Sequence, residues 1–409
     1  MMHGVDAKNI KIVYLVGGPL TKRWLSYYCV DEMSADFDVE FWDIAAILPD
    51  GYNVSSIEER PYARTILSLN DLRQNLKRLP KDTLLVNELG LVPSHYEVLK
   101  KVSIYIPNCV IIDFSTYFIW DVVEQLQTRP EGYSIKQRLY KNDIIWCVSK
   151  LLHCRSKADL QNLRQTLKNR KEDRQNIREL EKCRRLFNIY KITYKPFQQY
   201  TINHPDYEKY IQVRNTRERQ DKYILFIADN YPYHPEIVMK SGYDKDEVAK
   251  QYYASLNRFL DKVEETYGCK VVIAEHPSTH WEHNPFNGRE IIYFKTAELV
   301  RDSYAVCLHM SCAFSFVALF DKPVAILYNH ALNANQSMLT LVPRMANAIQ
   351  REIIDTDTID DVNGIFQPIC RLSRELYLRT FIEADSNKTN AQRLKEYFVE
   401  IHNEIIRRL

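Results

Sequence analysis

The sequence lacks the cysteine pairs of a CxxC motif and any regular cysteine framework, although nine cysteines are scattered through its 409 residues. Several of these cysteines lie inside apolar, strand-like runs, which is typical of reduced, buried thiols in a cytosolic protein. The first residues, MMHGVDAKNIKIVYLVGG, lack the long apolar core and the small-residue cleavage site of a secretory signal. No run approaches the ~20 apolar residues that would cross a bilayer. These absences predict a cytoplasmic location and leave open a peripheral contact with a membrane.

The sequence also lacks an excess of charge of one sign, since 55 basic and 53 acidic side chains leave a formal net charge of +2. A general attraction to nucleic acid is therefore excluded, and any anion must be bound by a local cluster. The charge is uneven, because basic residues outnumber acidic ones between Lys150 and Arg219. Two interpretations of this basic segment stay open: a solvated helical face held by ion pairs, or a surface for an anionic acceptor or an anionic membrane.

No repeat of fixed period and no GxGxxG motif occurs, but short apolar runs alternate with helix-like segments such as residues 63–79 and 312–320. Strands that alternate with helices predict parallel sheets with helices on both faces. The predicted strands are Ile10–Val16, Val39–Ile44, Thr83–Leu89, Cys109–Ser115, Asp143–Ser149, Tyr223–Asp229, Lys270–Glu275, Glu290–Phe294, Tyr304–Met310 and Pro323–Tyr328.

The length and the pattern together predict an α/β fold with two domains. We place an N-terminal Rossmann-like domain at 1–218, a C-terminal Rossmann-like domain at 219–385, and an amphipathic helix at 386–409. In that helix the apolar residues share one face, with Tyr397 at its edge. The residues on this face are Leu394, Phe398, Ile401, Ile405 and Leu409.

In open parallel sheets, ligands bind beyond the carboxyl ends of the strands, where loops meet helix N-termini. Two motifs of the second domain occupy such loops: His276-Pro277 in IAEHPST, and Ser311 to Ser315 in LHMSCAFSF. We expect them on neighbouring strand ends. The histidine would donate hydrogen bonds to phosphate or to a base carbonyl, with the proline fixing the turn, and the serine hydroxyls suit a phosphate.

Two more residues of this domain, near its short predicted helix TAELVRDS, suit a nucleotide. Glu298 would accept the ribose hydroxyls, and Lys295 would pair with a phosphate.

The ordered set IAEHPST, KTAELV and HMSCAFSFVALFDKPVAIL resembles the HP and serine motifs of two-domain bacterial glycosyltransferases that use CMP-activated acidic sugars. These are the sialyltransferases, polysialyltransferases and Kdo-transferases of capsule and lipopolysaccharide assembly. The resemblance implies the GT-B fold, in which two Rossmann-like domains face each other. It assigns the nucleotide to the C-terminal domain and the acceptor, a glycan or lipid-linked glycan, to the N-terminal one. The site then lies on the cytoplasmic side, where peripheral contact with the inner membrane stays open.

By the same resemblance, His276 and Pro277 would contact the cytidine nucleotide, Ser311 and Ser315 its phosphate, and Glu298 the ribose. The family needs no metal and no cofactor beyond the CMP-sugar donor, and we find no DxD pair placed at the end of a strand. Stabilisation of the leaving group would then come from hydrogen-bond donors of the protein.

Three carboxylates compete as the catalytic base: Asp229, Glu88 and Asp113, each near the end of a predicted strand. Sialyltransferases of this kind carry an acidic pair followed by glycine, and the nearest likeness here is NELG, which contains Glu88. We rank Asp229 first because the loop after it, NYPYHPE, is rich in aromatic residues and histidine.

The loops around these motifs hold further candidates. Tyr231, Tyr233 and His234 would form a wall against the donor sugar. The HWEH cluster at 280–283 is predicted to be another loop wall rather than a metal site. Gly17 and Gly18 shape a loop on the acceptor side.

Four functions stay open. The leading one transfers a Kdo-like or nonulosonic acid from a CMP donor to a capsule, O-antigen or lipooligosaccharide glycan. The others are a transferase that uses a UDP-sugar, a GDP-sugar or CDP-glycerol, a nucleotide-sugar epimerase on the same fold, and a non-catalytic glycan-binding or nucleotide-binding module.

Overall fold

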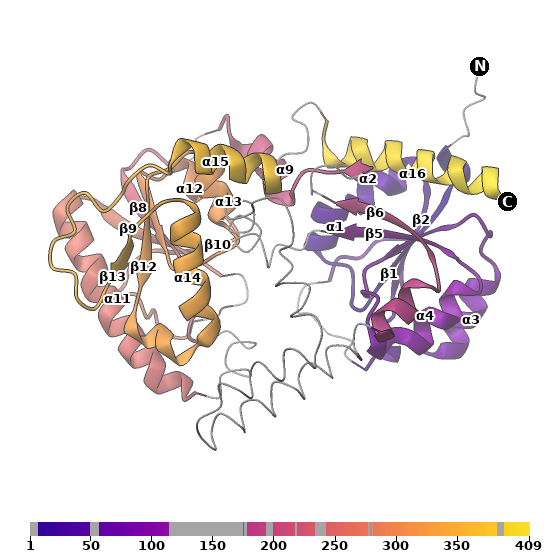
Figure 1. The fold of residues 1–409 in the computed structure, drawn as a ribbon, viewed down its shortest axis with the longest axis horizontal. Helices are drawn as coiled ribbons and strands as arrows, with labels where there is room; N and C mark the ends of the chain where they lie inside the picture. Colours follow the sequence, from indigo (N-terminus) through magenta and orange to yellow (C-terminus); the bar gives the residue numbers. More distant parts are fainter. Residues whose placement is uncertain are drawn as a thin grey trace, which may run out of the picture. The chain divides into compact units, whose positions relative to one another are not determined.

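The computed structural model describes residues 7–49, 57–113, 175, 178–193, 199–216, 219–233, 243–276, 279, 281–382 and 388–409. These residues contain two separate sheets (Figure 1). The seven-stranded sheet contains β1 (Lys11–Val16), β2 (Asp38–Asp43), β3 (Ala63–Thr65), β4 (Leu84–Asn87), β5 (Asn108–Asp113), β6 (Asn188–Thr193) and β7 (Tyr200–Thr201). The six-stranded sheet contains β8 (Tyr223–Ile227), β9 (Lys270–Glu275), β10 (Ile291–Tyr293), β11 (Ala305–Leu308), β12 (Val324–Tyr328) and β13 (Ile353–Asp355).

Both sheets have the strand order of a doubly wound α/β fold. The first runs β3-β2-β1-β4-β5-β6-β7 and the second runs β10-β9-β8-β11-β12-β13. Counted within each sheet, both orders begin 3-2-1-4-5-6, and the strand pairs whose registers are defined are parallel. The order reverses between the first and fourth strands, which is where such sheets bind ligands. The fold therefore provides two switch points, one between β1 and β4 and one between β8 and β11.

The described helices connect these strands or cover them. They are α1 (Lys22–Tyr28), α2 (Val30–Asp36), α3 (Leu69–Lys77), α4 (Tyr96–Ser103), α9 (Pro205–Val213), α11 (Lys245–Tyr267), α12 (Thr296–Asp302), α13 (Phe314–Leu319), α14 (Gln336–Ala348), α15 (Arg371–Tyr377) and α16 (Asn390–Arg408). Among the helices of the described ranges, none combines the length and the hydropathy that a membrane span requires.

Local sequence sets where the longest helix starts and stops. The Asp244 carboxylate accepts hydrogen bonds from the backbone N–H groups of Asp246 (3.0 Å) and Glu247 (3.3 Å), which caps the first turn of α11. Gly268 ends the helix with φ of 62°, a left-handed conformation that glycine adopts without strain. These two signals fix the start and the end of α11.

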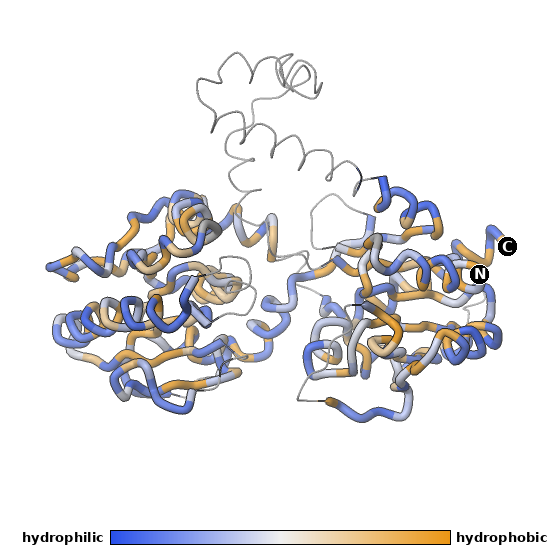
Figure 2. Tube along the Cα trace, turned by 90° about the horizontal axis from the view of Figure 1, so that it is seen from below, coloured by the Kyte–Doolittle hydropathy of each residue, from blue (hydrophilic) through white to orange (hydrophobic). Residues whose placement is uncertain are grey.

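The six-stranded sheet is buried on both faces, which explains why the sequence of β8 is a continuous apolar run. Ile224 and Phe226 pack with residues of α11 on one face. Leu225 and Ile227 pack with residues of α12, α13 and α14 on the other. Figure 2 shows the resulting hydrophobic strands inside each unit.

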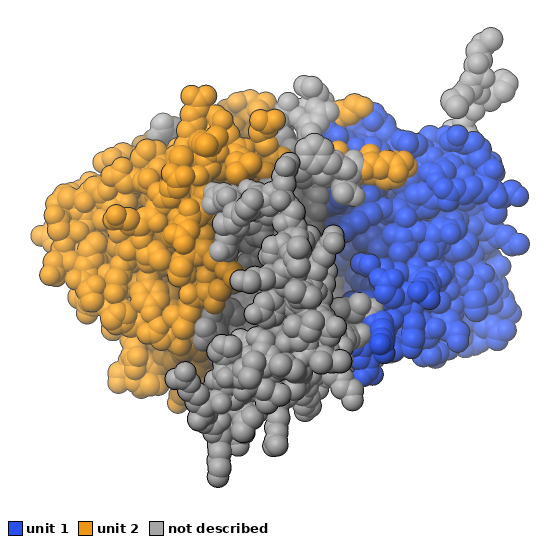
Figure 3. Space-filling view, viewed as in Figure 1, with its two compact units in different colours: residues 1–113, 129–193, 390–409 blue, residues 114–128, 194–389 orange. Residues whose placement is uncertain are grey.

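The described chain divides into two compact units (Figure 3). Unit 1 contains the described residues up to Asp113, those of 178–193, and Asn390–Leu409; unit 2 contains those from 199 to Thr389. The fold class predicted from the sequence, two α/β domains on parallel sheets with a C-terminal helix, is confirmed.

The first domain boundary lies near residue 194 rather than at 218. The reason is α9, which follows this boundary and packs into unit 2. Its Tyr207 and Val213 belong to the same core cluster as Leu225 of β8.

The C-terminal helix is not a separate body, because α16 packs on unit 1. Phe398 meets Phe37 edge to face at 6.1 Å between ring centroids. His402 Nε2 lies 2.9 Å from Asp82 Oδ2. Four of the five residues of the predicted apolar face are buried, which confirms that face for Leu394, Phe398, Ile401 and Ile405. The fifth, Leu409, is 76% exposed.

Two further predictions meet the structure only in part. The predicted helix at 63–79 is wrong at its start, because its first residues form β3 and α3 begins only after Ser68, whose side chain accepts a hydrogen bond from the Asp71 N–H. The predicted strand at 143–149 lies outside the described residues, and so do residues 150–174 of the basic segment. In the part that is described, Lys182 pairs with Glu179.

Candidate functional site

Three predicted site residues follow three adjacent strands of unit 2. Asp229 comes after β8, His276 directly after β9, and Ser311 after β11. Since β9 and β11 flank β8 and all three are parallel, these loops leave the same edge of the sheet at its switch point. The prediction of neighbouring strand ends needs one correction: β8 lies between β9 and β11, so these two strands are about 10 Å apart at two interstrand spacings.

Asp229 has the carboxyl group most suited to proton transfer at this edge. Burial raises its pKa from 3.8 to about 7, and the charge of Glu275 on the adjacent strand adds to the rise. Asp229 Oδ1 accepts a hydrogen bond from the backbone N–H of Tyr231 at 3.3 Å. Asp229 Oδ2 is buried and has no hydrogen-bond partner among the described residues. A carboxyl group with a pKa near neutrality and an unused oxygen can both take and give a proton.

Glu275, the last residue of β9, is a site residue that the sequence analysis missed. It is 2% exposed, and burial raises its pKa. Its Oε1 accepts the backbone N–H of His276 at 2.8 Å, and its Oε2 accepts the indole N–H of Trp281 at 2.8 Å. Glu275 thus fixes the start and the far side of the loop that carries the HP motif. A signal was present, since the HP pair comes directly after this charged residue in an otherwise apolar strand.

Aromatic rings surround this loop. Tyr233 and Tyr253 each meet Trp281 edge to face, at 5.7 and 5.9 Å between ring centroids. The predicted sugar wall is corrected at Tyr231, which is 2% exposed and donates its hydroxyl proton to the Ala331 carbonyl at 2.6 Å. Tyr231 is therefore a core residue, while Tyr233 is half-buried against Trp281. The other wall residue, His234, and the predicted nucleotide contact Pro277 lie outside the described residues, as does His280.

The two predicted phosphate serines differ in accessibility. Ser311 is half-buried, and its Oγ accepts the backbone N–H of Ala313 at 3.2 Å. Ser315 is 1% exposed, and its hydroxyl donates to the carboxylate of Asp206 in α9. The helix that holds Ser315 begins at Phe314, later than predicted. In this conformation the Ser315 hydroxyl is bound inside unit 2, so Ser311 is the serine better placed to meet a ligand.

Glu298 and Lys295 lie at the start of α12, the helix that follows β10. Glu298 Oε1 is 2.5 Å from the Lys209 ammonium, and Glu298 Oε2 is buried without a hydrogen-bond partner among the described residues. Lys295 directly precedes the helix and is exposed. The nucleotide contacts assigned to both residues stay predictions.

The switch point of unit 1 carries the other two predicted carboxylates. Glu88 follows β4, next to the Gly17 turn that follows β1, and burial raises its pKa to about 8. The Tyr28 hydroxyl donates to Glu88 Oε2 at 2.7 Å, while Glu88 Oε1 is buried without a hydrogen-bond partner among the described residues. Asp113 ends the adjacent β5 and forms an ion pair with Lys191 at 2.8 Å. Their predicted position at strand ends is confirmed, whereas their catalytic role is untested.

A pocket of about 620 Å³ lies away from both of these strand ends. It is lined by residues such as Lys222, Arg301 and Tyr304 near the amino ends of the unit 2 strands. Arg301 is engaged there by a two-fold hydrogen bond to Asp302 at 2.7 and 2.8 Å. This pocket is therefore on the opposite edge of the sheet from the predicted site residues.

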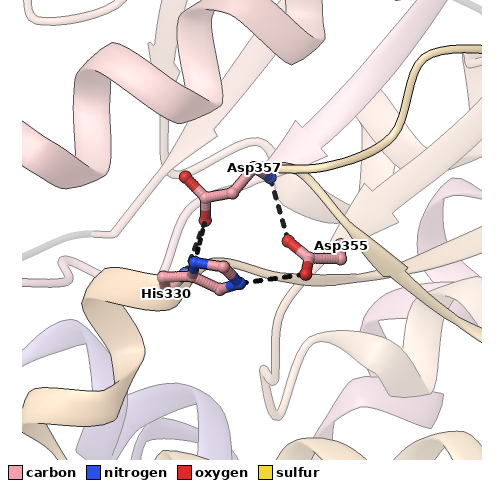
Figure 4. A group of neighbouring side chains, drawn as sticks. All are labelled: His330, Asp355 and Asp357. Atoms are coloured by element: carbon pink, nitrogen blue, oxygen red, sulfur yellow. Dashed lines mark hydrogen bonds and ion pairs between the residues drawn. The ribbon is translucent and has the colours of Figure 1, made fainter.

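One expectation about metal ligands is wrong. Asp355-Thr356-Asp357 is a DxD pair at the end of β13, a strand that the sequence analysis did not predict. Figure 4 shows both carboxylates beside His330, which follows β12.

No protein-family model and no curated protein matches this chain. Solved structures with a similar fold include spinosyn forosaminyltransferase SpnP, with 12% identity, a TM-score of 0.36 and 98% of each chain covered. The wall teichoic acid polymerase TagF shares 11% identity at a TM-score of 0.40, covering 98% of this chain and 91% of that one. The UDP-N-acetylglucosamine 2-epimerase of Rickettsia bellii shares 10% at 0.37, covering 97% and 95%. Likenesses at these scores carry no argument about activity.

Proposed function

We propose that the chain is a glycosyltransferase of the GT-B type that transfers an acidic sugar, of the Kdo or nonulosonic type, from a CMP donor to a bacterial surface glycan. One observation carries the proposal. Asp229, His276 and Ser311, which are far apart in the sequence, follow three adjacent strands at the switch point of unit 2. That is the place where doubly wound sheets bind nucleotides.

The chemistry needs one base and one well-held leaving group. The acceptor hydroxyl attacks the anomeric carbon of the donor sugar while a carboxylate takes its proton. The bond between that carbon and the phosphate oxygen breaks, and its electron pair leaves with CMP. With a pKa of about 7, Asp229 is about half ionised at neutral pH and can accept the proton. His276 and Ser311 would hold the nucleotide and its phosphate by hydrogen bonds.

Glu88 is the second candidate for the base. Its pKa of about 8 also lies near neutrality. Its Oε1, like Asp229 Oδ2, is buried and has no hydrogen-bond partner among the described residues. In the two-domain scheme that the motifs suggest, Glu88 belongs to the acceptor side. The two carboxylates are therefore tested in parallel.

A nucleotide-sugar epimerase is the second candidate function. It needs acid and base groups on both sides of one sugar, and the carboxyl pair formed by Asp229 and Glu275 on adjacent strands favours it. An epimerase interconverts two nucleotide sugars without an acceptor and without releasing the nucleotide. Product analysis therefore separates the two functions.

The test incubates the full chain with CMP-linked acidic sugars and acceptor glycans, and follows CMP release and glycan mass. We expect acceptor-dependent CMP release that falls about 100-fold or more in Asp229→Asn, the size of effect expected when a general base is lost. Asp360→Asn, at a fully exposed carboxylate, is the matched control. Loss in Glu88→Gln but not in Asp229→Asn would move the base to unit 1. Interconversion of the nucleotide sugar without CMP release would replace the transferase by the epimerase.

A further inference from the structure

Three side chains with metal-ligating atoms meet at the far side of the unit 2 sheet, beyond β12 and β13. Tyr328, the last residue of β12, is in register with Asp355, the last residue of β13. His330 follows the first strand by two residues, and Asp357 follows the second by two. Because the two parallel strands end side by side, their loops bring an imidazole and two carboxylates together (Figure 4).

The distances in this cluster suit one shared ion. His330 Nε2 is 3.0 Å from Asp355 Oδ2, and His330 Nδ1 is 3.9 Å from Asp357 Oδ2. One ligand atom from each residue can be chosen so that all three lie within 4.8 Å of one another. Two ligands of one zinc ion are at most about 4.4 Å apart, since each sits about 2.2 Å from it. The spacing of the three atoms is therefore within a few tenths of an ångström of the largest separation that two ligands of one ion can have.

Backbone hydrogen bonds position both carboxylates before any ion arrives. Asp357 Oδ2 accepts the backbone N–H of His330 at 2.6 Å, and Asp355 Oδ1 accepts the backbone N–H of Asp357 at 2.9 Å. Asp355 Oδ2 and Asp357 Oδ2 are the carboxylate oxygens nearest the imidazole, and each can bind an ion while it also accepts a hydrogen bond. Ligands that are held in this way lose little conformational entropy when an ion binds.

The charge of the cluster also favours a cation. Two carboxylates face one imidazole, and Arg258 is the one arginine or lysine of the described residues within 4.0 Å of either carboxylate. The Arg258 guanidinium donates to the backbone carbonyl of Asp357 at 3.4 Å, lies 4.0 Å from its carboxylate and is 54% exposed. A solvated arginine at this distance from the carboxylate neutralises little of its charge.

We propose that His330, Asp355 and Asp357 form a binding site for a divalent first-row transition-metal ion of the Mn²⁺ or Zn²⁺ type. An imidazole with two carboxylates is a mixed nitrogen and oxygen set, which such ions accept and Mg²⁺ disfavours. The half-exposed position leaves room for water or an anion in the remaining coordination sites. The site lies two strands away from β8, so it is separate from the proposed nucleotide site and independent of the proposed function.

Metal binding to the full chain tests this inference directly. The protein is stripped with a chelator, and Zn²⁺, Mn²⁺ and Mg²⁺ are titrated separately by calorimetry. We expect one equivalent of Zn²⁺ or Mn²⁺ to bind, with affinity at least 10-fold weaker in His330→Ala and in Asp355→Asn. His283→Ala is the matched control, since His283 is an exposed histidine outside the cluster.

The spectrum of Co²⁺, used as a probe ion, adds a readout of the ligands. A nitrogen and oxygen site gives a characteristic visible absorption that should disappear in His330→Ala and persist in His283→Ala. Far-UV circular dichroism verifies that each variant is folded, and Asp357→Asn replaces any variant that is not. Equal Zn²⁺ affinity in the wild type and in the cluster variants, or no stoichiometric binding, would overturn the proposal and leave a hydrogen-bonded surface cluster.

Discussion

Replacing Asp229 by asparagine should make unit 2 more stable at neutral and alkaline pH and leave its stability unchanged below about pH 4. Burial raises the pKa of this carboxyl group from 3.8 to about 7 in the folded chain. Between these two values the folded state holds a proton that the unfolded state has released, so stability falls as the pH rises. Above pH 7 the folded protein contains a buried, ionised carboxylate. Asparagine removes this titration and keeps an oxygen that can accept the Tyr231 N–H.

The size of the effect follows from the pKa difference. A difference of about three units at about 1.4 kcal/mol each gives an upper limit of about 4 kcal/mol, reached above pH 7. Because part of this penalty is already present at pH 5, the advantage of Asp229→Asn should grow by roughly 2–3 kcal/mol between pH 5 and pH 8.

Urea unfolding at a series of pH values measures this difference, with intrinsic fluorescence as the signal. Asp360→Asn is the matched control, because its carboxylate is fully exposed and should give a difference that does not change with pH. An Asp229→Asn variant whose stability relative to the wild type is the same at pH 5 and pH 8 would refute the claim that this carboxyl group is buried with a pKa near neutrality.

Three further substitutions probe other parts of the structure. Phe398→Ala removes a ring of α16 that is 0% exposed and should destabilise unit 1 by about 3–5 kcal/mol. Thermal unfolding and proteolysis of the C-terminus would detect this loss. Tyr28→Phe removes the hydrogen bond to Glu88, so the pKa of Glu88 should rise further above 8. If Glu88 is the base, the rising, acid-side limb of the pH profile should move to higher pH, because the reaction needs its ionised form. An unchanged pH profile would separate Glu88 from the reaction. Ser315→Ala leaves the partly buried Asp206 carboxylate without this donor and should destabilise unit 2 by about 1–3 kcal/mol without weakening nucleotide binding. A large loss of nucleotide binding would instead support the prediction that Ser315 contacts the phosphate.

The sheets were predictable from the sequence where a strand is buried on both faces. YILFI and KVVIAE are apolar runs because helices cover both sides of β8 and β9, so hydropathy alone marks them. Ala63–Thr65 and Ile353–Asp355 were missed because each has only three residues, at an edge of its sheet, where burial leaves little hydrophobic signal. The domain boundary was missed because α9 is polar on its outer face, which made it look like a linker.

The candidate site was predictable only at the level of strand ends. Asp229, His276 and Ser311 could be placed because each directly follows an apolar run. Glu275 was overlooked since a charged residue at the end of a strand looks exposed until its two hydrogen bonds to the following loop are seen. The metal-ligating cluster could not be found without β13, whose pairing with β12 brings His330 to Asp355 across 24 intervening residues of chain.

The difference between the two serines could not come from the sequence at all. Ser311 and Ser315 lie four residues apart in one motif, and both suit a phosphate by residue type. Only tertiary packing, which places α9 and Asp206 against Ser315, distinguishes them.

Nucleotide binding at the switch point of unit 2 is the central claim, and a thermal-shift titration tests it most directly. Purified protein is titrated with CMP, CDP, UMP, UDP and GDP, and the series is repeated on His276→Ala and on His330→Ala, a control at an exposed histidine outside the proposed nucleotide site. A ligand that binds only the folded state raises the midpoint of unfolding by mass action. The account predicts a rise with CMP that is lost in His276→Ala and kept in His330→Ala. A rise with UDP or GDP and none with CMP would contradict the donor assignment, and no rise with any of the five nucleotides would contradict the claim itself.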